Sequence, residues 1–358
     1  MSLWSEFIRS KLDASASLWP GDDRDDIAHF GDTAAEYAAL KAGPAIAYRP
    51  ERSIIEISGA DRASWLHNIT TNQVKTLSTG QGNYVFVCNA AGRILFDANV
   101  LVRPESIWVD VDGACADSAL KHFDKYIVME DVAVCDCTTR FVRLALVGAA
   151  SPGVLEAHGL SNAGNLPLLE SATVTIGDAT MTLVRTDFCG PWSVELFVEV
   201  DHAPGVWTAL TGDGRATPVG CEAVEICRIE AGVPRWGCEI TDNTLPGETG
   251  RSDRAVSTNK GCYIGQEVIE RMRSRGVVAR KLVGLVVSGD GVPAAGAAVL
   301  DVDRTVGSVT SACRSIGMER PIALAYVKPQ WAAFEKELRI EFEGVEVAAT
   351  VCPLPLVE

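Results

Sequence analysis

The sequence lacks the features that would place the protein in a membrane or in an export pathway. No apolar run approaches the roughly eighteen residues that cross a bilayer. Residues 1–7 lack the basic stretch and apolar core of a signal peptide. The eleven cysteines are an odd number without regular spacing, which is typical of a reducing compartment. We therefore expect a cytoplasmic protein that does not contact a membrane.

Motifs for nucleotides and for structural metals are also missing. No G-x-G-x-x-G and no P-loop follows a strand-like segment, which disfavours nucleotide-binding folds. The C-x-C formed by Cys135 and Cys137 has no second cysteine or histidine pair at metal spacing, and the five histidines are scattered. We expect no metal site.

The chain lacks positive charge overall, since its formal net charge is -15. Non-specific nucleic-acid binding depends on phosphate neutralisation, so no stable nucleic-acid binding is expected. One segment departs from this balance: residues 251–281 carry eight Lys or Arg against three Asp or Glu, a local charge of +5. Such a segment would suit an anionic small molecule, or an RNA that binds transiently.

The basic segment contains the octapeptide K-G-C-Y-I-G-Q-E at residues 260–267. The glycines around Cys262 allow sharp turns and close approach to a ligand, and residues 266–272 are typical of a helix. A helix N-terminus and a nearby cation such as Lys260 favour a thiolate. A cysteine is most often a small buried apolar residue. That alternative fits the other ten cysteines better than Cys262, whose neighbours are polar or glycine.

Apolar periodicity indicates strands mixed with helices up to about residue 276. A helix is expected over residues 32–42, with Asp32 or Thr33 as N-cap and Glu36 at capping-box spacing. The order of the elements, with several antiparallel strand pairs, suggests α+β layers rather than a doubly wound sheet. The strand pair most clearly marked by its turn lies at residues 83–88 and 94–102.

After Gly276 the pattern changes to short strands separated by glycine turns, which is typical of a small barrel or sandwich. We place a domain boundary at this point. An α+β region, with the Cys262 loop at its end, is expected over residues 1–276, and a β-barrel domain over residues 277–358.

The octapeptide resembles the signature of the YgfZ-type folate-binding proteins. These are relatives of the glycine-cleavage T-protein (aminomethyltransferase) superfamily that support iron–sulfur enzymes. Further blocks resemble the superfamily in order along the chain: W-L-H-N-I-T-T-N-Q-V at 65–74, G-Q-G-N-Y at 80–84, G-R-I-L-F-D at 92–97, G-P-W-S-V-E-L at 190–196, R-I-E-A-G-V-P-R-W-G at 228–237 and P-G-E at 246–248. The octapeptide makes the YgfZ branch the better match.

The resemblance implies two intertwined ferredoxin-like α+β domains and a C-terminal β-barrel, arranged as a three-domain ring with folate in a central channel. It also implies tetrahydrofolate, or a one-carbon derivative of it, as the cofactor. Asp97 would take the position of an aspartate at the reacting folate nitrogens. Glu195 would match a glutamate that hydrogen-bonds the pterin edge, where an ionised carboxylate accepts two adjacent N–H groups.

The remaining roles implied by the resemblance concern the ring and the tail of folate. Tyr84 and Trp236 would stack on the flat ring or wall it, and Arg228 would pair with the carboxylates of the glutamate tail. Cys262 would lie on a loop facing the channel, with Lys260 close by.

Three of these residues have simpler alternatives. Asp97 and Glu195 would then be polar strand residues that face water. Arg228 would be a helix-surface partner of Glu222 or Glu225, an ion pair that contributes roughly 0.3–0.5 kcal/mol.

The expected function is that of a tetrahydrofolate-binding protein that supports the assembly or repair of iron–sulfur enzymes, including enzymes of tRNA modification, through Cys262. Its partners would be iron–sulfur proteins or their assembly factors. If Cys262 contacts a cluster, one cysteine is too few to hold that cluster alone, so a partner or a second protomer would be needed. The sequence does not choose among redox, cluster-contact and nucleophilic roles for this thiol.

The alternatives are a folate-dependent aminomethyltransferase that uses Asp97, and a scaffold in which folate is purely structural. Superfamily enzymes usually carry paired acids where this chain has Phe96 and Asp97. The missing carboxylate weakens the case for aminomethyl transfer, which needs a group to manage a proton. The sequence leaves open whether any reaction is catalysed.

Overall fold

The computed structural model describes residues 3–12, 14–18, 26–190, 192–276 and 278–357. Some residues named in the predictions above lie outside the described residues. They are Pro191 in the 190–196 block, Val277 at the predicted domain boundary, and residues 1, 2 and 358 at the chain ends. The chain divides into two compact units, which we describe separately. Unit 1 comprises Met1–His67, Gln73–Tyr84 and Ala98–Glu225, and unit 2 comprises Asn68–Asn72, Val85–Asp97 and Ile226–Glu358.

A five-stranded sheet is formed by strands that follow one another closely along the chain. Its order is β5-β6-β7-β4-β8, and the pairings of β6 with β7, β7 with β4 and β4 with β8 are antiparallel. The strand pair predicted at residues 83–88 and 94–102 is confirmed as β5 and β6. The elements of this region are β4 (Arg52–Ser58), α3 (Arg62–Ile69), β5 (Gly82–Cys88), β6 (Ile94–Val102), β7 (Ile107–Asp112), α4 (Ala116–Lys125) and β8 (Ala133–Asp136).

A six-stranded sheet has the order β10-β11-β12-β9-β3-β13, antiparallel except for the parallel pair β13 and β3. Its strand β3 precedes the five-stranded sheet in the chain and its other strands follow that sheet, so the two sheets are intertwined in sequence. The strands are β3 (Ala45–Tyr48), β9 (Phe141–Val147), β10 (Ser171–Ile176), β11 (Ala179–Thr186), β12 (Ser193–Glu199) and β13 (Thr217–Val219).

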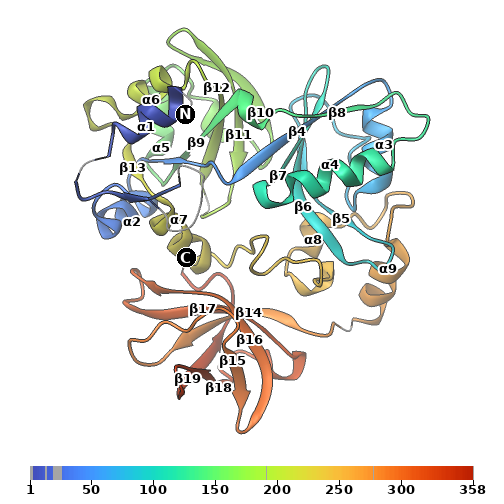
Figure 1. Cartoon of the computed structure of the whole chain (residues 1–358), viewed down its shortest axis with the longest axis vertical. Coiled ribbons are helices and arrows are strands. Elements are labelled where there is room, and N and C mark those ends of the chain that lie inside the picture. The colour runs from blue at the N-terminus through green and yellow to red at the C-terminus, as the bar shows by residue number, and fades with distance from the viewer. Residues whose placement is uncertain (1–2, 13, 19–25, 191, 277, 358) are drawn as a thin grey trace. The chain divides into compact units, whose positions relative to one another are not determined.

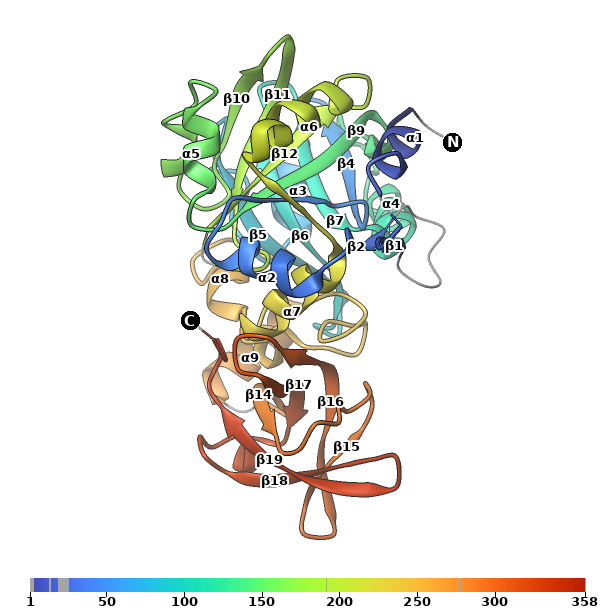
Figure 2. The same cartoon turned by 90° about the vertical axis from the view of Figure 1, so that its left-hand side faces the viewer.

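The two faces of the six-stranded sheet bury different partners within unit 1. One face packs against helices α1 (Leu3–Arg9), α5 (Ser151–Glu156) and α6 (Ala203–Thr211), whose Trp4 and Trp207 join its core (Figure 2). The other face packs Val184 and Phe197 against Trp108 of the five-stranded sheet. Because side chains alternate along a strand, this second face also receives Glu195, two residues before Phe197.

Helix α2 (Thr33–Lys41) has the predicted N-cap but not the predicted capping box. The carboxylate of Asp32 accepts hydrogen bonds from the main-chain N–H groups of Ala34 and Ala35. Since Asp32 is the N-cap, Glu36 lies one position too far along the helix for a capping box. Its carboxylate instead accepts from the N–H groups of Phe30 at 2.7 Å and Gly220 at 2.8 Å. A small sheet of β1 (Ser17–Leu18) and β2 (Ile27–His29) precedes this helix.

A closed six-stranded barrel ends the chain (Figure 1). It confirms the predicted barrel, and with the mixed sheets it confirms the α+β class. Its order is β14-β17-β16-β15-β18-β19, and Leu285, Leu338 and Ile340 are among its core residues. The strands are β14 (Lys281–Val287), β15 (Ala298–Asp301), β16 (Arg304–Ser315), β17 (Arg320–Val327), β18 (Glu337–Phe342) and β19 (Val345–Cys352).

The predicted boundary between residues 276 and 277 stays a prediction, because unit 2 holds the barrel together with segments that precede it in the chain. These segments include α8 (Ser252–Ala255), α9 (Gln266–Arg275) and the end of α7 (Cys221–Glu230). None of the helices within the described ranges combines the length and the apolar character needed to cross a membrane.

Candidate functional site

Glu195 lies on β12 in a buried ion cluster of unit 1. Its residue is only 2 % exposed, so the alternative that it faces water is wrong. Its Oε1 accepts a hydrogen bond from Arg49 at 2.8 Å, and its Oε2 accepts from Nε and a second nitrogen of Arg143. The arginines therefore fix the position of this carboxylate between the two sheets.

The same cluster extends to Asp110 on β7. Arg143 donates to both carboxylate oxygens of Asp110, at 2.5 and 2.7 Å, and Arg52 donates at 3.1 Å. Burial alone would raise the pKa of the Asp110 carboxyl, but the charges and hydrogen bonds of Arg143 and Arg52 hold it well below its usual range. Removing one member of such a buried cluster would leave an uncompensated charge.

Sequence reasoning did not find the arginines of this cluster. The available signal was a charge flanked on both sides by apolar residues in each of two strands, Asp110 in I-W-V-D-V-D and Arg143 in F-V-R-L-A-L-V. An ionisable residue in a strand that is otherwise apolar is rarely buried without a partner, so each charge indicates a partner elsewhere in the chain.

Asp97 and Tyr84 lie on the neighbouring strands β6 and β5. Asp97 belongs to unit 2 and is 8 % exposed, so the alternative that it faces water is also wrong. Its neighbour Phe96 is buried as well. Tyr84 belongs to unit 1 and is half-buried. Trp236, in the turn that follows α7, is half-buried in unit 2.

Arg228 on α7 is a buried anchor inside unit 2. Its guanidinium donates to the carboxylate of Glu239 at 3.0 Å, the carbonyl of Val233 at 2.6 Å and the hydroxyl of Ser311 at 2.8 Å. Glu239 also accepts from the hydroxyls of Thr310 and Ser311 on β16. Arg228 thus ties α7 to the barrel, and its pairing with a folate tail stays a prediction.

Lys260 fastens the octapeptide loop to a segment that is distant in sequence. Its amine is buried and donates to the carbonyls of Thr70 at 2.5 Å and Asn72 at 2.9 Å. Burial lowers the pKa of Lys260 to about 7. The hydroxyl of Thr71 strengthens the junction by donating to the carbonyl of Ala255 at 2.7 Å. Two of the predicted blocks, 65–74 and 260–267, therefore meet.

Gly265 brings the same loop against the turn between β5 and β6. It caps the start of α9 with a φ of 81°, and a Cβ built on it would lie 2.5 Å from the carbonyl oxygen of Asn89. Cys262 is exposed, whereas Tyr263 is buried with its ring centroid 5.2 Å from the Lys260 amine. The loop is anchored by Lys260, Tyr263 and Gly265 and exposes the thiol between them.

The charge of the basic segment is partly neutralised within unit 2. Arg271 pairs with Glu267 on α9, and Arg273 pairs with Glu270 at 2.7 Å. Arg280 pairs with Glu248 at 3.0 Å. Glu267 and Glu270 are already counted in the charge of +5, so only the pair with Glu248, which lies outside the segment, lowers that charge further. Across the described ranges, no group of three or more His, Cys, Asp or Glu side chains is arranged to hold a metal ion.

Comparison with known proteins gives two family matches that together cover most of the chain. Residues 28–260 match the GCVT N-terminal domain, and residues 280–358 match the glycine cleavage T-protein C-terminal barrel domain. The chain belongs to the glycine cleavage T-protein family. This membership confirms the superfamily, while the YgfZ branch stays a prediction.

Among the relatives of this T-protein family member is an aminomethyltransferase of Streptomyces coelicolor, 29 % identical over 98 % of this chain and 98 % of the relative. An aminomethyltransferase of Rubrobacter xylanophilus is 32 % identical over 89 % of this chain and 87 % of the relative. The crystal structure of the glycine cleavage system aminomethyltransferase T of Bartonella henselae covers 100 % of this chain and 98 % of its own, with a TM-score of 0.89 and 23 % identity. The similarity to the Bartonella henselae structure shows that this chain has the same fold.

Proposed function

We propose that this T-protein family member binds tetrahydrofolate and carries out a folate-dependent aminomethyl transfer. The aminomethyltransferases that it resembles along nearly their whole length support this reaction class. The observation that carries the proposal is the buried carboxylate of Asp97, at the position that the resemblance assigns to the reacting folate nitrogens. Tetrahydrofolate supplies the nitrogen that accepts the one-carbon unit. Asp97 holds or receives the proton at that nitrogen.

Glu195 fits a pterin contact through one oxygen. A carboxylate offers about four acceptor positions. Arg143 uses two on Oε2 and Arg49 uses one on Oε1, so one position on Oε1 remains for a ring N–H. A contact through both oxygens would require one arginine bond to break. We therefore propose that Glu195 accepts one hydrogen bond from the pterin ring, rather than the two that the sequence suggested.

A second candidate function is favoured by the exposed thiol of Cys262. In this candidate the chain binds tetrahydrofolate but acts, like the YgfZ-type proteins, in the assembly or repair of iron–sulfur enzymes. The firm anchoring of Lys260 and Gly265 supports it, because such anchoring holds an exposed cysteine in a defined position. The buried Phe96, where superfamily enzymes usually carry a second acid, also favours it.

One pair of variants separates the two candidates. Under the main proposal, Asp97→Asn lowers aminomethyl transfer by about 100-fold or more, because the proton at the folate nitrogen loses its partner. Cys262→Ser leaves the rate unchanged, since this exposed thiol takes no part. The measurement is formation of methylenetetrahydrofolate from an aminomethyl donor.

The opposite pattern favours the second candidate. There the wild type shows no transfer, and Cys262→Ser, but not Asp97→Asn, lowers the activity of iron–sulfur enzymes in cells that depend on this protein. Thermal melting of both variants close to that of the wild type excludes misfolding as the cause in either case.

A further inference from the structure

A cavity of about 520 Å³ lies within unit 2 beside the barrel. None of the seven residues predicted to act on folate or as the functional thiol lines it. Its walls come from the turn after α7, the segment before α8, the start of β14, the segment between β17 and β18, and the end of β19 with the residues that follow it.

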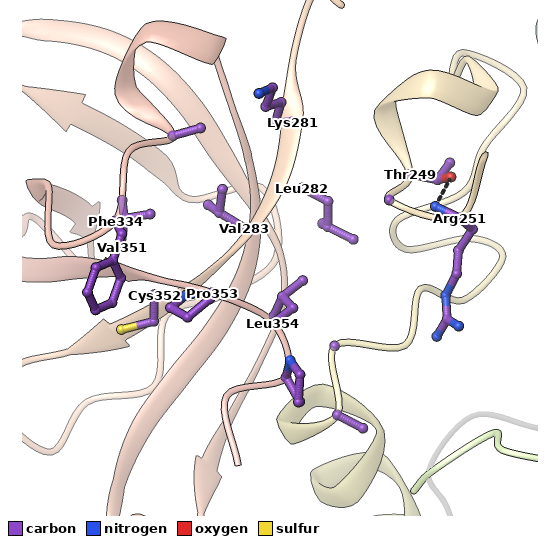
Figure 3. A pocket seen from close by; sticks show the side chains of 15 residues that line it. Thr249, Arg251, Lys281, Leu282, Val283, Phe334, Val351, Cys352, Pro353 and Leu354 are labelled. Atoms are coloured by element: carbon purple, nitrogen blue, oxygen red, sulfur yellow. Dashed lines mark hydrogen bonds between the residues drawn. The ribbon is translucent and has the colours of Figure 1, made fainter. Parts of the chain in front are cut away.

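The charged side chains of this cavity are all positive. Arg251 and Lys281 line it, and no carboxylate does. Lys281 is exposed at the start of β14. The hydroxyl of Thr249 is already engaged, since it donates to the carbonyl of Pro246 and accepts from the N–H of Arg251. The side chains of Lys281 and Arg251 lie on different sides of the cavity (Figure 3), so an anionic group entering beside β14 would meet the amine of Lys281.

Most of the remaining wall is apolar. The side chains of Leu282 and Leu354 lie between the barrel and the segment that carries Thr249 and Arg251 (Figure 3). Phe334, on the opposite side, is 63 % exposed, so its ring is accessible to a ligand. An apolar wall with a cation beside it suits a ligand that has an apolar body and an anionic group.

We propose that this cavity is a second binding site, for a small amphipathic anion with a flat or extended apolar body and one carboxylate, sulfonate or similar group. The volume lies within the about 300–1,000 Å³ typical of small-molecule sites. Leu282, Leu354 and Phe334 contact the apolar body. The exposed amine of Lys281 binds the anionic group through a charge-assisted hydrogen bond.

The test uses two fluorescent probes that differ in charge. The anionic probe is 8-anilinonaphthalene-1-sulfonate, and the neutral probe is N-phenyl-1-naphthylamine, which lacks the sulfonate. Lys281→Glu reverses one charge of the cavity. Lys328→Glu, an exposed lysine that follows β17 and does not line the cavity, is the matched control.

The proposal predicts saturable binding of one sulfonate probe per chain, weakened about tenfold by Lys281→Glu and unchanged by Lys328→Glu. The neutral probe binds more weakly, and saturating tetrahydrofolate does not displace the sulfonate. Equal effects of the two substitutions, equal affinity for both probes, or no saturable binding to folded protein would each overturn the proposal. Competitive displacement by tetrahydrofolate would also overturn it, because the cavity would then belong to the folate site.

Discussion

Within the octapeptide, the environment of the Lys260 amine differs most from what the sequence predicts. A lysine two residues before Cys262 suggests a fixed positive charge beside the thiol. The structure instead buries the amine against two main-chain carbonyls, and burial brings the pKa of Lys260 down to about 7. The contact with Thr70 joins positions 190 residues apart, so no local pattern contains it.

The burial of Lys260 predicts a pH-dependent stability. Its pKa is about 7 in the folded protein and 10.5 ordinarily. Between these values the unfolded chain binds more protons than the folded one, so the free energy of unfolding rises with pH. The rise is at most about 1.4 kcal/mol per pH unit for one group. Below pH about 7 both states are protonated and this contribution no longer changes.

Urea unfolding between pH about 7 and about 10 checks this expectation. The wild type should gain stability with pH more steeply than Lys260→Met. The exposed-lysine variant Lys328→Met should keep the slope of the wild type. Parallel curves for the wild type and Lys260→Met would mean that the amine is not buried as the structure shows.

Strands that are marked by a local apolar pattern could be predicted from the sequence. Strands that form only by pairing with a strand distant in the chain could not. The strand pair expected at residues 83–88 and 94–102 is found as β5 and β6, because two apolar runs and the turn between them mark it locally. The strands β3 and β13 were missed. The three residues of β13 include Pro218, so their sequence alone does not indicate a strand. They form one only because they pair with β3.

The start of α9 offers a matched pair of glycine substitutions. Gly265→Ala should destabilise the protein by about 1–3 kcal/mol, because the residue has a positive φ and its Cβ would contact the carbonyl of Asn89. Gly261→Ala should have little effect, since no atom outside its neighbours lies within 4 Å of the Cβ position. Chemical unfolding measures both changes. Equal stability of the two variants would contradict the close approach of the loop to the β5–β6 turn.

For the whole molecule, the sequence predicted the class, the C-terminal barrel and the superfamily, since each rests on patterns within short segments. It did not predict what holds Glu195. The arginines that bind this carboxylate lie 52 and 146 positions away, and only the assembled sheets bring them together. The candidate site was thus predictable as a set of residues but not as a hydrogen-bonded arrangement.

Folate binding through Glu195 is the central claim for the whole molecule. Calorimetric titration of tetrahydrofolate under reducing conditions tests it with the wild type, Glu195→Gln and the control Glu199→Gln, an exposed position on the same strand. We expect saturable binding to the wild type, weakened about tenfold or more by Glu195→Gln and unchanged by Glu199→Gln. Absence of binding to wild-type protein that circular dichroism shows to be folded would contradict this expectation.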